Sequence, residues 1–267
     1  MNFVCPKCHG ALTVCDGVAK CQSGHSYDRA KAGYFNLLLS SSGGTHGDNR
    51  EMIEARRAFL DTGAYFPLAK RVSELVVKHL LGNCVLDIGC GEGYYTDIIA
   101  KAISDKQASV SAFDISKDAV KYAARRNKGI ELAVASAYKM PVADGSVDLA
   151  VNMFSPLATD EISRVLRKDG IFILAVPGEE HLFGLKSAAY KTPYKNELAD
   201  PQINGFELIQ TERISYELDL KSREDVSSLF MMTPYAYRTP PEDKKRVLSL
   251  GSLKTSADFV VFAYKKL

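Results

Sequence analysis

The first 25 residues contain four side chains with the chemistry and spacing of a zinc site. Cys5 and Cys8 form one pair, and Cys21 and His25 form a second pair after the twelve residues 9–20. Each pair fits one tight turn, and three thiolates with one imidazole make a closed tetrahedral set. Because protein ligands would fill all four positions, we predict a structural Zn2+ ion that does not activate water.

Two neighbouring residues are left out of this predicted ligand set. His9 directly follows Cys8 and cannot easily join the same tetrahedron, and Cys15 has no partner at ligand spacing. The alternative interpretation is a set of free core cysteines, which the clustering disfavours. The segment is also too short to bury a core of its own, which favours a metal.

A second candidate site is the glycine-rich segment 87–93, Asp-Ile-Gly-Cys-Gly-Glu-Gly, between a predicted strand and a predicted helix. A dinucleotide-binding loop needs a further glycine where Tyr94 stands, and its amides face a pyrophosphate. Asp87 and Glu92 would repel a pyrophosphate, whereas the sulfonium and ammonium groups of S-adenosylmethionine favour negative neighbours. A phosphate-binding loop is the alternative. From this segment we expect cofactor contacts by Asp87, Gly89, Gly91 and Gly93.

Two positions further along complete the predicted cofactor site. Asp114 ends the second predicted strand, where a carboxylate can accept hydrogen bonds from both ribose hydroxyls of a nucleoside. Ser136 follows the third predicted strand, where backbone and small polar groups usually frame an adenine. Together with Asp114, the glycine loop resembles that of the class I S-adenosylmethionine-dependent methyltransferases.

The elements around these residues predict an α/β fold. From residue 83, short apolar runs alternate with amphipathic stretches, which indicates a Rossmann-like parallel sheet with right-handed crossovers. Strands are predicted at 84–88, 109–114, 130–135, 147–154 and 171–176, with antiparallel additions at 206–220 and 258–265. Helices are predicted at 50–60, 65–81, 95–103, 117–127 and 160–167.

The polar, glycine-rich run from Ser40 to Asn49 divides the chain. We therefore expect a zinc-binding module over residues 1–38, a flexible linker over 39–50 and a methyltransferase domain over 51–267.

Composition limits the function classes. The chain has 267 residues, 46% hydrophobic and 25% charged, which excludes collagen-like, disordered and coiled-coil proteins. No basic stretch followed by an apolar run begins the sequence, and no run approaches the ~18 apolar residues of a membrane span, so we expect a cytoplasmic protein without a membrane partner. The net charge of +2 lacks the strong basic excess that many nucleic-acid binders carry.

No residue is nominated as the catalytic group for methyl transfer. Enzymes that methylate carbon 5 of a pyrimidine add a thiolate to the ring. No cysteine follows the fourth predicted strand, so this mechanism is disfavoured. Asn152, at the end of the fourth predicted strand of the sheet, could orient an acceptor, but an amide cannot act as a general base.

Several segments in one order carry a closer resemblance. They are the Cys/His set, Ala30–Leu38, Ala55–Asp61, the loop Asp87–Thr96 and Met232–Tyr235. This combination resembles the bacterial 23S ribosomal RNA guanine-N1 methyltransferases, which include the tylosin-resistance type. The resemblance implies methylation of guanine N1 in a hairpin loop of 23S rRNA, zinc in a module over residues 1–38 that helps to recognise RNA, and a homodimer with an RNA cleft. It also implies cofactor contacts by Tyr65, Gly91, Glu92 and His181.

The resemblance also suggests where RNA phosphates would bind. We hypothesise a basic patch of Arg29, Lys31, Arg56 and Arg57 at the junction of the two domains, although Arg56 and Arg57 could simply form a solvated helix face. Two other functions remain open from the sequence: a small-molecule methyltransferase with a zinc-ribbon appendage, and a methyltransferase-like RNA-binding assembly factor without turnover.

Overall fold

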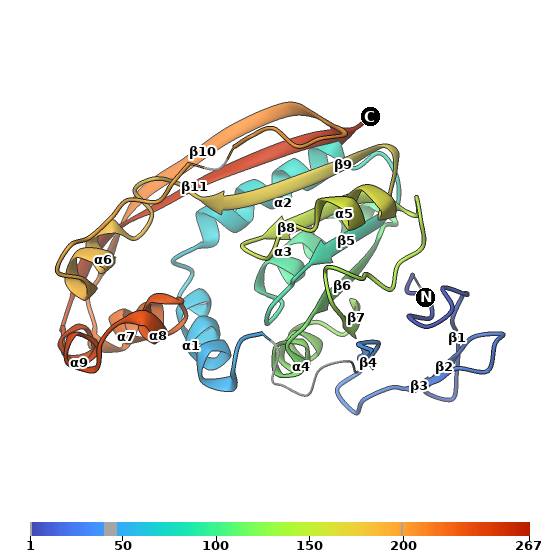
Figure 1. Ribbon diagram of the computed structural model, residues 1–267, viewed down its shortest axis with the longest axis horizontal. Helices are drawn as coiled ribbons and strands as arrows, with labels where there is room; N and C mark the ends of the chain where they lie inside the picture. Colours follow the sequence, from blue (N-terminus) through green and yellow to red (C-terminus); the bar gives the residue numbers. More distant parts are fainter. Residues whose placement is uncertain (1, 40–46, 199) are drawn as a thin grey trace.

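The computed structural model describes residues 2–39, 47–198 and 200–267 (Figure 1). Its strands are β1 (Thr13–Cys15), β2 (Val18–Lys20), β3 (Ser26–Asp28), β4 (Phe35–Asn36), β5 (Cys84–Ile88), β6 (Ser109–Asp114), β7 (Glu131–Val134), β8 (Val147–Met153), β9 (Leu166–Pro177), β10 (Phe206–Leu220) and β11 (Leu253–Lys266). Its helices are α1 (Arg50–Asp61), α2 (Phe66–His79), α3 (Tyr94–Ala102), α4 (Lys117–Arg126), α5 (Thr159–Val165), α6 (Phe183–Ala189), α7 (Arg223–Met231), α8 (Tyr235–Arg238) and α9 (Pro241–Leu248), with the short 3-10 helix η1 (Ser104–Lys106).

An eight-stranded sheet in the order β10-β11-β9-β8-β5-β6-β7-β4 forms the centre of the molecule (Figure 1). Strands β4 to β9 run parallel to one another, and β10 and β11 are antiparallel additions next to β9. The α/β class and the antiparallel additions are therefore confirmed. A separate three-stranded sheet, β1-β2-β3, lies near the N-terminus.

Most predicted elements are present, with some differences at the ends. The helix predicted at 160–167 ends at Val165, because Leu166 is already extended and begins β9. The sequence reasoning missed β1, β2 and β3, whose three-residue strands are too short to show a period. It also missed β4, the edge strand of the eight-stranded sheet, and the helices α6 to α9.

Side chains alternate between the two faces of the sheet, and different parts of the chain cover each face. Val85 of β5 belongs to a core shared with helices α1 to α4 and α7, whereas its neighbour Leu86 points into a second core. That second core contains Phe3, Leu12 and Cys21 of the N-terminal segment together with α5. Parallel strands need cover on both faces. The cysteine-containing segment therefore supplies part of the cover for one face.

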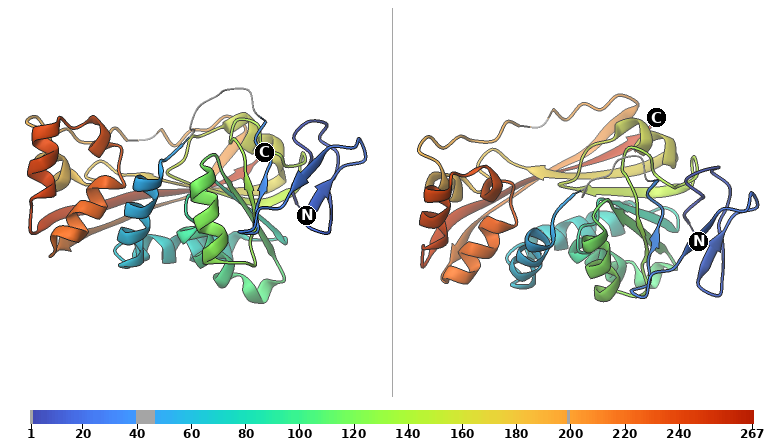
Figure 2. Two further views of the ribbon diagram at one scale, coloured as in Figure 1. Left: turned by 90° about the horizontal axis from the view of Figure 1, so that it is seen from below. Right: turned by 60° about the horizontal axis from the view of Figure 1, so that its bottom comes forward.

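Backbone pairing also attaches the N-terminal segment to the sheet. Phe3 forms a bridge with Val142, and the Val4 N–H donates to the Pro141 carbonyl at 2.8 Å. Phe35 of β4 pairs with β7 and is buried. In the further views the segment lies at one end of the molecule and α7 to α9 at the other (Figure 2).

The predicted linker lies mostly outside the described residues, which omit 40–46. Beyond it, Asn49 caps α1 by accepting a hydrogen bond from the Met52 N–H at 2.9 Å. Within the described ranges, every helix is too short or too polar to cross a bilayer.

Burial of Phe35 provides a test of this docking. Phe35→Ala should lower the free energy of unfolding by about 3–5 kcal/mol, because it leaves a cavity between β4 and the second core. Phe66→Ala is the matched control, since Phe66 is 50% exposed and its truncation should cost under about 1 kcal/mol. Urea denaturation at fixed zinc concentration measures both variants. Equal effects of the two substitutions would contradict the docking.

Candidate functional site

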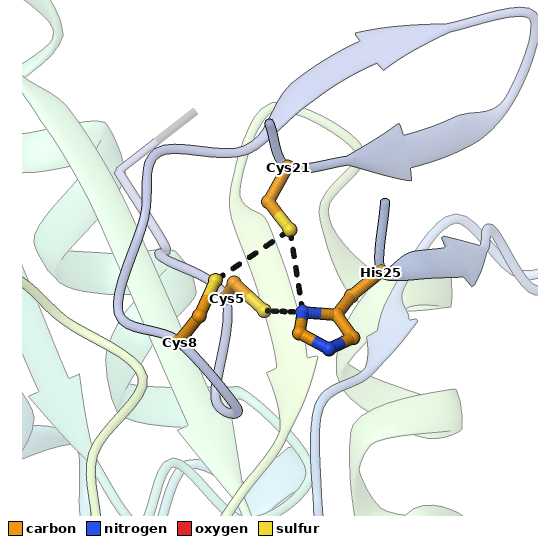
Figure 3. A group of neighbouring side chains, drawn as sticks. All are labelled: Cys5, Cys8, Cys21 and His25. Carbon is orange, nitrogen blue, oxygen red and sulfur yellow. Dashed lines mark hydrogen bonds between the residues drawn. The ribbon is translucent and has the colours of Figure 1, made fainter. Parts of the chain in front are cut away.

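The structure brings the four predicted zinc ligands together (Figure 3). Their donor atoms all lie within 4.8 Å of one another. The Sγ atoms of Cys8 and Cys21 are 3.6 Å apart, and His25 Nδ1 lies 3.5 Å from Cys5 Sγ and 3.4 Å from Cys21 Sγ. A tetrahedron with Zn–S bonds of about 2.3 Å has edges of about 3.8 Å, so this set fits zinc.

Two tight turns place these ligands. The Cys5 N–H donates to the Gly10 carbonyl at 2.8 Å and closes the first turn. In the second, the Gly24 N–H donates to the Cys21 carbonyl and the Cys21 N–H to the His25 carbonyl, both at 3.1 Å. Gly24 has φ +84°, a conformation that glycine adopts without strain.

The surroundings of the cluster act on its thiols in opposite directions, since burial raises the pKa of Cys21 whereas hydrogen bonds favour the thiolate of Cys8. A hydrogen bond from the Gly10 backbone, helped by Ser23 and His25, lowers the pKa of Cys8 to about 6. The Tyr27 hydroxyl lies 3.2 Å from Cys5 Sγ and can support that ligand from outside the tetrahedron. Cys15 is exposed on β1 and, like His9, lies outside the cluster, as predicted.

The glycine loop lies at the carboxyl edge of the parallel strands, where ligands bind in open α/β sheets. Asp114, at the end of β6, accepts hydrogen bonds from the Gly91 N–H at 3.0 Å and the Ser116 N–H at 2.8 Å. Asp87, at the end of β5, accepts from the Thr96 hydroxyl at 2.5 Å. These bonds connect the loop to β6 and to the first turn of α3.

Burial makes both carboxyl groups harder to ionise. It raises the pKa of Asp87 to about 6, and it raises the pKa of Asp114 as well. Cationic groups placed beside them would restore their charge. The site therefore fits a ligand that brings positive charge, as S-adenosylmethionine does.

Glycine is needed at two loop positions for close packing. A Cβ at Gly89 would lie 2.4 Å from Ser155 Cβ, and one at Gly93 would lie 2.9 Å from Ala123 Cβ. Both glycines also have positive φ, +75° and +86°. At Gly91 the nearest atom to such a Cβ is Arg56 Nη1 at 3.8 Å, so the backbone there is open on one side.

Glu92, a residue of the glycine loop, forms a buried ion pair. Its carboxylate accepts from Arg126 at 2.6 Å, and Arg126 also donates to Asp61 at 2.9 Å. Burial nevertheless raises the pKa of Glu92, and its Oε1 has no hydrogen-bond partner among the described residues. An unpartnered buried carboxylate oxygen fits a donor supplied by a bound ligand.

Tyr65 and His181 are far apart in the sequence but adjacent in space. The Tyr65 hydroxyl lies 3.4 Å from His181 Nε2, and the Asp258 N–H donates to His181 Nδ1 at 3.3 Å. Burial lowers the pKa of His181 to about 4, so the imidazole is neutral at pH 7. Because Nδ1 accepts, Nε2 carries the proton and can donate to Tyr65.

Ser136 lies in a tight turn directly after β7. Its hydroxyl accepts from the Tyr138 N–H at 3.2 Å, and its carbonyl accepts from the Lys139 N–H at 3.2 Å. The turn places Ser136 at the same sheet edge as Asp114 at the end of β6.

Two sequence hypotheses need correction. Asn152 is fully buried, and its amide accepts from the Ser155 N–H at 3.3 Å and donates to the Pro156 carbonyl at 3.1 Å, so it braces its own loop. It is not available to orient a substrate.

The four residues of the hypothesised basic patch do not line one groove together. Arg29 and Lys31 line a groove of about 640 Å³ between the N-terminal segment and the α4–β7 connection. Arg56 instead pairs with Asp48 and donates to the Met232 carbonyl, while Arg57 pairs with Asp61 at 3.4 Å.

Two residues near the loop were missed. Thr96 is fully buried in the first turn of α3. The sequence feature that could have identified it is a threonine on the apolar side of that helix. Arg56 was noticed as a charge, but its position beside Gly91 depends on α1 packing near the loop, which no local pattern shows.

Comparison with known proteins agrees with this arrangement. Residues 3–40 match the zinc-ribbon family model described as RlmA, N-terminal, and residues 85–170 match a methyltransferase domain model. A 23S rRNA (guanine(748)-N(1))-methyltransferase of Streptomyces fradiae is 31% identical over 251 residues, covering 91% of this chain and 88% of the relative. This chain belongs to the 23S rRNA guanine-N1 methyltransferase family.

Two other relatives carry names for the same guanine-N(1) reaction on 23S rRNA. One, from Micromonospora griseorubida, is 32% identical and covers 89% of this chain and 87% of the relative. The other, YxjB of Bacillus subtilis, is 29% identical and covers 97% of this chain and 94% of the relative. The predicted family and methyltransferase class are thereby confirmed.

The ligand cluster predicts how zinc content responds to substitution. Cys21→Ser and His25→Ala should each reduce bound zinc from about one ion per chain to well below half, because each removes one of four ligands. Cys15→Ser, in the same segment but outside the cluster, should leave the zinc content unchanged. Elemental analysis of the purified proteins measures this. Full zinc content in both ligand variants would contradict the assignment.

The buried carboxyl groups predict a pH dependence of cofactor binding. Since the pKa of Asp87 is raised to about 6, protonation below that pH removes the negative charge that attracts a cationic ligand. Affinity for S-adenosylmethionine should therefore be highest above pH 7 and fall through pH 6, by up to about tenfold per pH unit for one group. Calorimetry between pH 5 and 8 measures it, with Asp87→Asn as the variant expected to flatten the profile. A wild-type affinity independent of pH would contradict the idea.

Proposed function

We propose that this chain transfers a methyl group from S-adenosylmethionine to N1 of a guanine in a hairpin loop of 23S ribosomal RNA. The observation that carries the proposal is the joint presence of the zinc ribbon and the methyltransferase domain in a chain similar, over 91% of its length, to a relative named for that reaction. The open carboxyl edge with its buried acidic groups supports the use of this cationic methyl donor.

The residues of the loop would hold the cofactor in distinct ways. The donor, when bound, supplies a methyl carbon activated by a sulfonium. We propose that Asp114 accepts from the ribose hydroxyls, that Asp87 and Glu92 compensate the positive charges, and that Ser136 frames the adenine. The remaining proposed contacts come from the backbone at Gly89, Gly91 and Gly93 and from the side chains of Tyr65 and His181.

The neutral His181 and buried Tyr65 shape the site without adding charge. Guanine N1 carries a proton at neutral pH, and we assign no side chain to remove it. Cys90 is buried and its pKa is raised well above the usual value, so it stays protonated. Direct displacement on a positioned acceptor fits these residues better than covalent catalysis.

We propose that residues 1–38 are the RNA-recognition module, 39–50 the linker and 51–267 the catalytic domain. Arg29, Lys31 and Lys128 supply positive charge to the groove that the module makes with the α4–β7 connection, where RNA phosphates can bind. We also propose a cytoplasmic homodimer, which the family resemblance supports.

Methylation of a defined RNA tests the function. With labelled S-adenosylmethionine, the purified chain should incorporate up to about one methyl per 23S rRNA hairpin transcript, and N1 methylation should stop reverse transcription at a single guanine. Asp114→Ala should reduce the rate at least tenfold, because the Gly91 N–H of the loop and the Ser116 N–H both lose their acceptor. Mass mapping of the product identifies the base.

Two outcomes would favour other functions. Labelling of small metabolites but not of RNA would indicate a small-molecule methyltransferase. Tight hairpin binding without production of S-adenosylhomocysteine would indicate an assembly factor.

A further inference from the structure

Phe154, the first residue after β8, has an unusual backbone conformation and an exposed ring. Its φ is +60°, in the left-handed region that glycine tolerates and a bulky side chain does not favour. It is 41% exposed, although it directly follows the buried residues 149–153. Such strain persists only where the surrounding structure imposes it, and it concentrates at functional sites.

The neighbouring residues hold this conformation in place. The Phe154 N–H donates to the Ala175 carbonyl at 3.3 Å, and the buried Asn152 amide bonds to the backbone at Ser155 and Pro156. The Ser155 hydroxyl donates to the Ile88 carbonyl at 2.8 Å, and Ser155 fills the space against Gly89. The loop after β8 is therefore fastened directly to the start of the glycine loop.

One part of the ring packs on a cluster of aromatic side chains at the same sheet edge. The Phe154 ring centroid lies 5.6 Å from that of Phe259 and 6.2 Å from that of Tyr95, the second residue of α3. Phe259 is fully buried and contacts both Tyr65 and His181, with centroid separations of 5.0 and 4.6 Å. Phe154 is thus the exposed member of an aromatic cluster that includes two proposed cofactor residues.

We propose that Phe154 is the platform on which the target guanine stacks after it leaves the RNA hairpin. This inference rests on the proposed function. A base whose ring atom is to be modified must be taken out of its stack, and unstacked RNA bases are held on aromatic side chains. In the transfer, a bond forms between guanine N1 and the methyl carbon, the carbon–sulfur bond breaks with its electron pair going to sulfur, and the N1 proton passes to solvent.

Stacking on Phe154 explains why a strained aromatic stands at this position. An exposed phenylalanine with φ +60° gains little from burial, and a glycine or asparagine would fit the backbone better. A flat apolar face beside the glycine loop, however, fixes the plane of a purine and leaves the ring edge, where N1 lies, free to meet the methyl donor.

Substitution with leucine separates stacking from packing. Phe154→Leu keeps an apolar cover over Phe259 but has no aromatic face, so kcat/KM for the hairpin should fall about 10- to 100-fold, the range measured for loss of one stacking ring. Phe154→Tyr and Phe154→Trp should stay within about threefold of wild type. Affinity for S-adenosylmethionine should change less than about twofold in all three variants.

Two control variants test whether the effect comes from any change in this loop or from a loss of stability. Leu157→Ala, in the same loop and 42% exposed, should leave kcat/KM unchanged. Phe154→Gly removes the ring and the backbone strain together, so it should lose methylation at least as severely as Phe154→Leu while its Tm stays at or above that of the leucine variant.

The outcomes distinguish this inference from the function on which it rests. If wild type methylates the hairpin but leucine supports the same kcat/KM as tyrosine, the ring only packs and the inference is wrong. A parallel loss of cofactor affinity in Phe154→Leu would also overturn it. If wild type leaves the hairpin unmethylated, the proposed function itself fails, whatever the variants do.

Discussion

Cover for both faces of the central sheet is the constraint on which the rest of the structure depends. Parallel strands are stable only when neither face meets water, and here helices α1 to α4 cover one face while the zinc-ligating segment and α5 cover part of the other. Phe3 and Cys21 share a core with Leu86 and Ile88, and Ile88 leads directly into Gly89. The metal centre and the cofactor loop are therefore connected through one packed layer.

The carboxyl edge of this sheet concentrates negative charge that is costly to bury. Asp87 and Asp114 end neighbouring strands, and Glu92 follows in the loop with one oxygen unpartnered among the described residues. Burial raises the pKa of each of them. A protein that folds with such groups beside an open glycine backbone is prepared for a cationic ligand and discriminates against a phosphate.

The loop after β8 holds the proposed acceptor position next to the cofactor site. Ser155 packs on Gly89, Asn152 braces the turn from inside, and Phe154 is held in a strained conformation with part of its ring exposed. The residues that would meet the base are thereby fastened to those that would meet the methyl donor. Catalysis by alignment requires a fixed relative position, and here the hydrogen bond from the Ser155 hydroxyl to the Ile88 carbonyl at 2.8 Å and the packing of Ser155 on Gly89 set it.

Several features could be predicted from the sequence because their signals are local. The zinc ligands are two pairs separated by short turns, and the glycine loop with Asp114 follows strands whose apolar runs are plain. Periodicity also predicted the sheet, including the antiparallel β10 and β11. In each case residues close in the chain carry the pattern, so no knowledge of tertiary contacts was needed.

Contacts between distant segments were decided only by the tertiary structure. The sequence could not show that Arg56 lies beside Gly91 and outside the groove that Arg29 lines, or that the Asn152 amide is already occupied. Nor could it show that Tyr65 meets His181, 116 residues away, or that Phe154 joins their aromatic cluster. The sequence by itself determined which chemical groups are present and which strands end beside them. Which groups face each other depended on how the strands are ordered and how both faces are covered, because side-chain partners are fixed only when those layers pack.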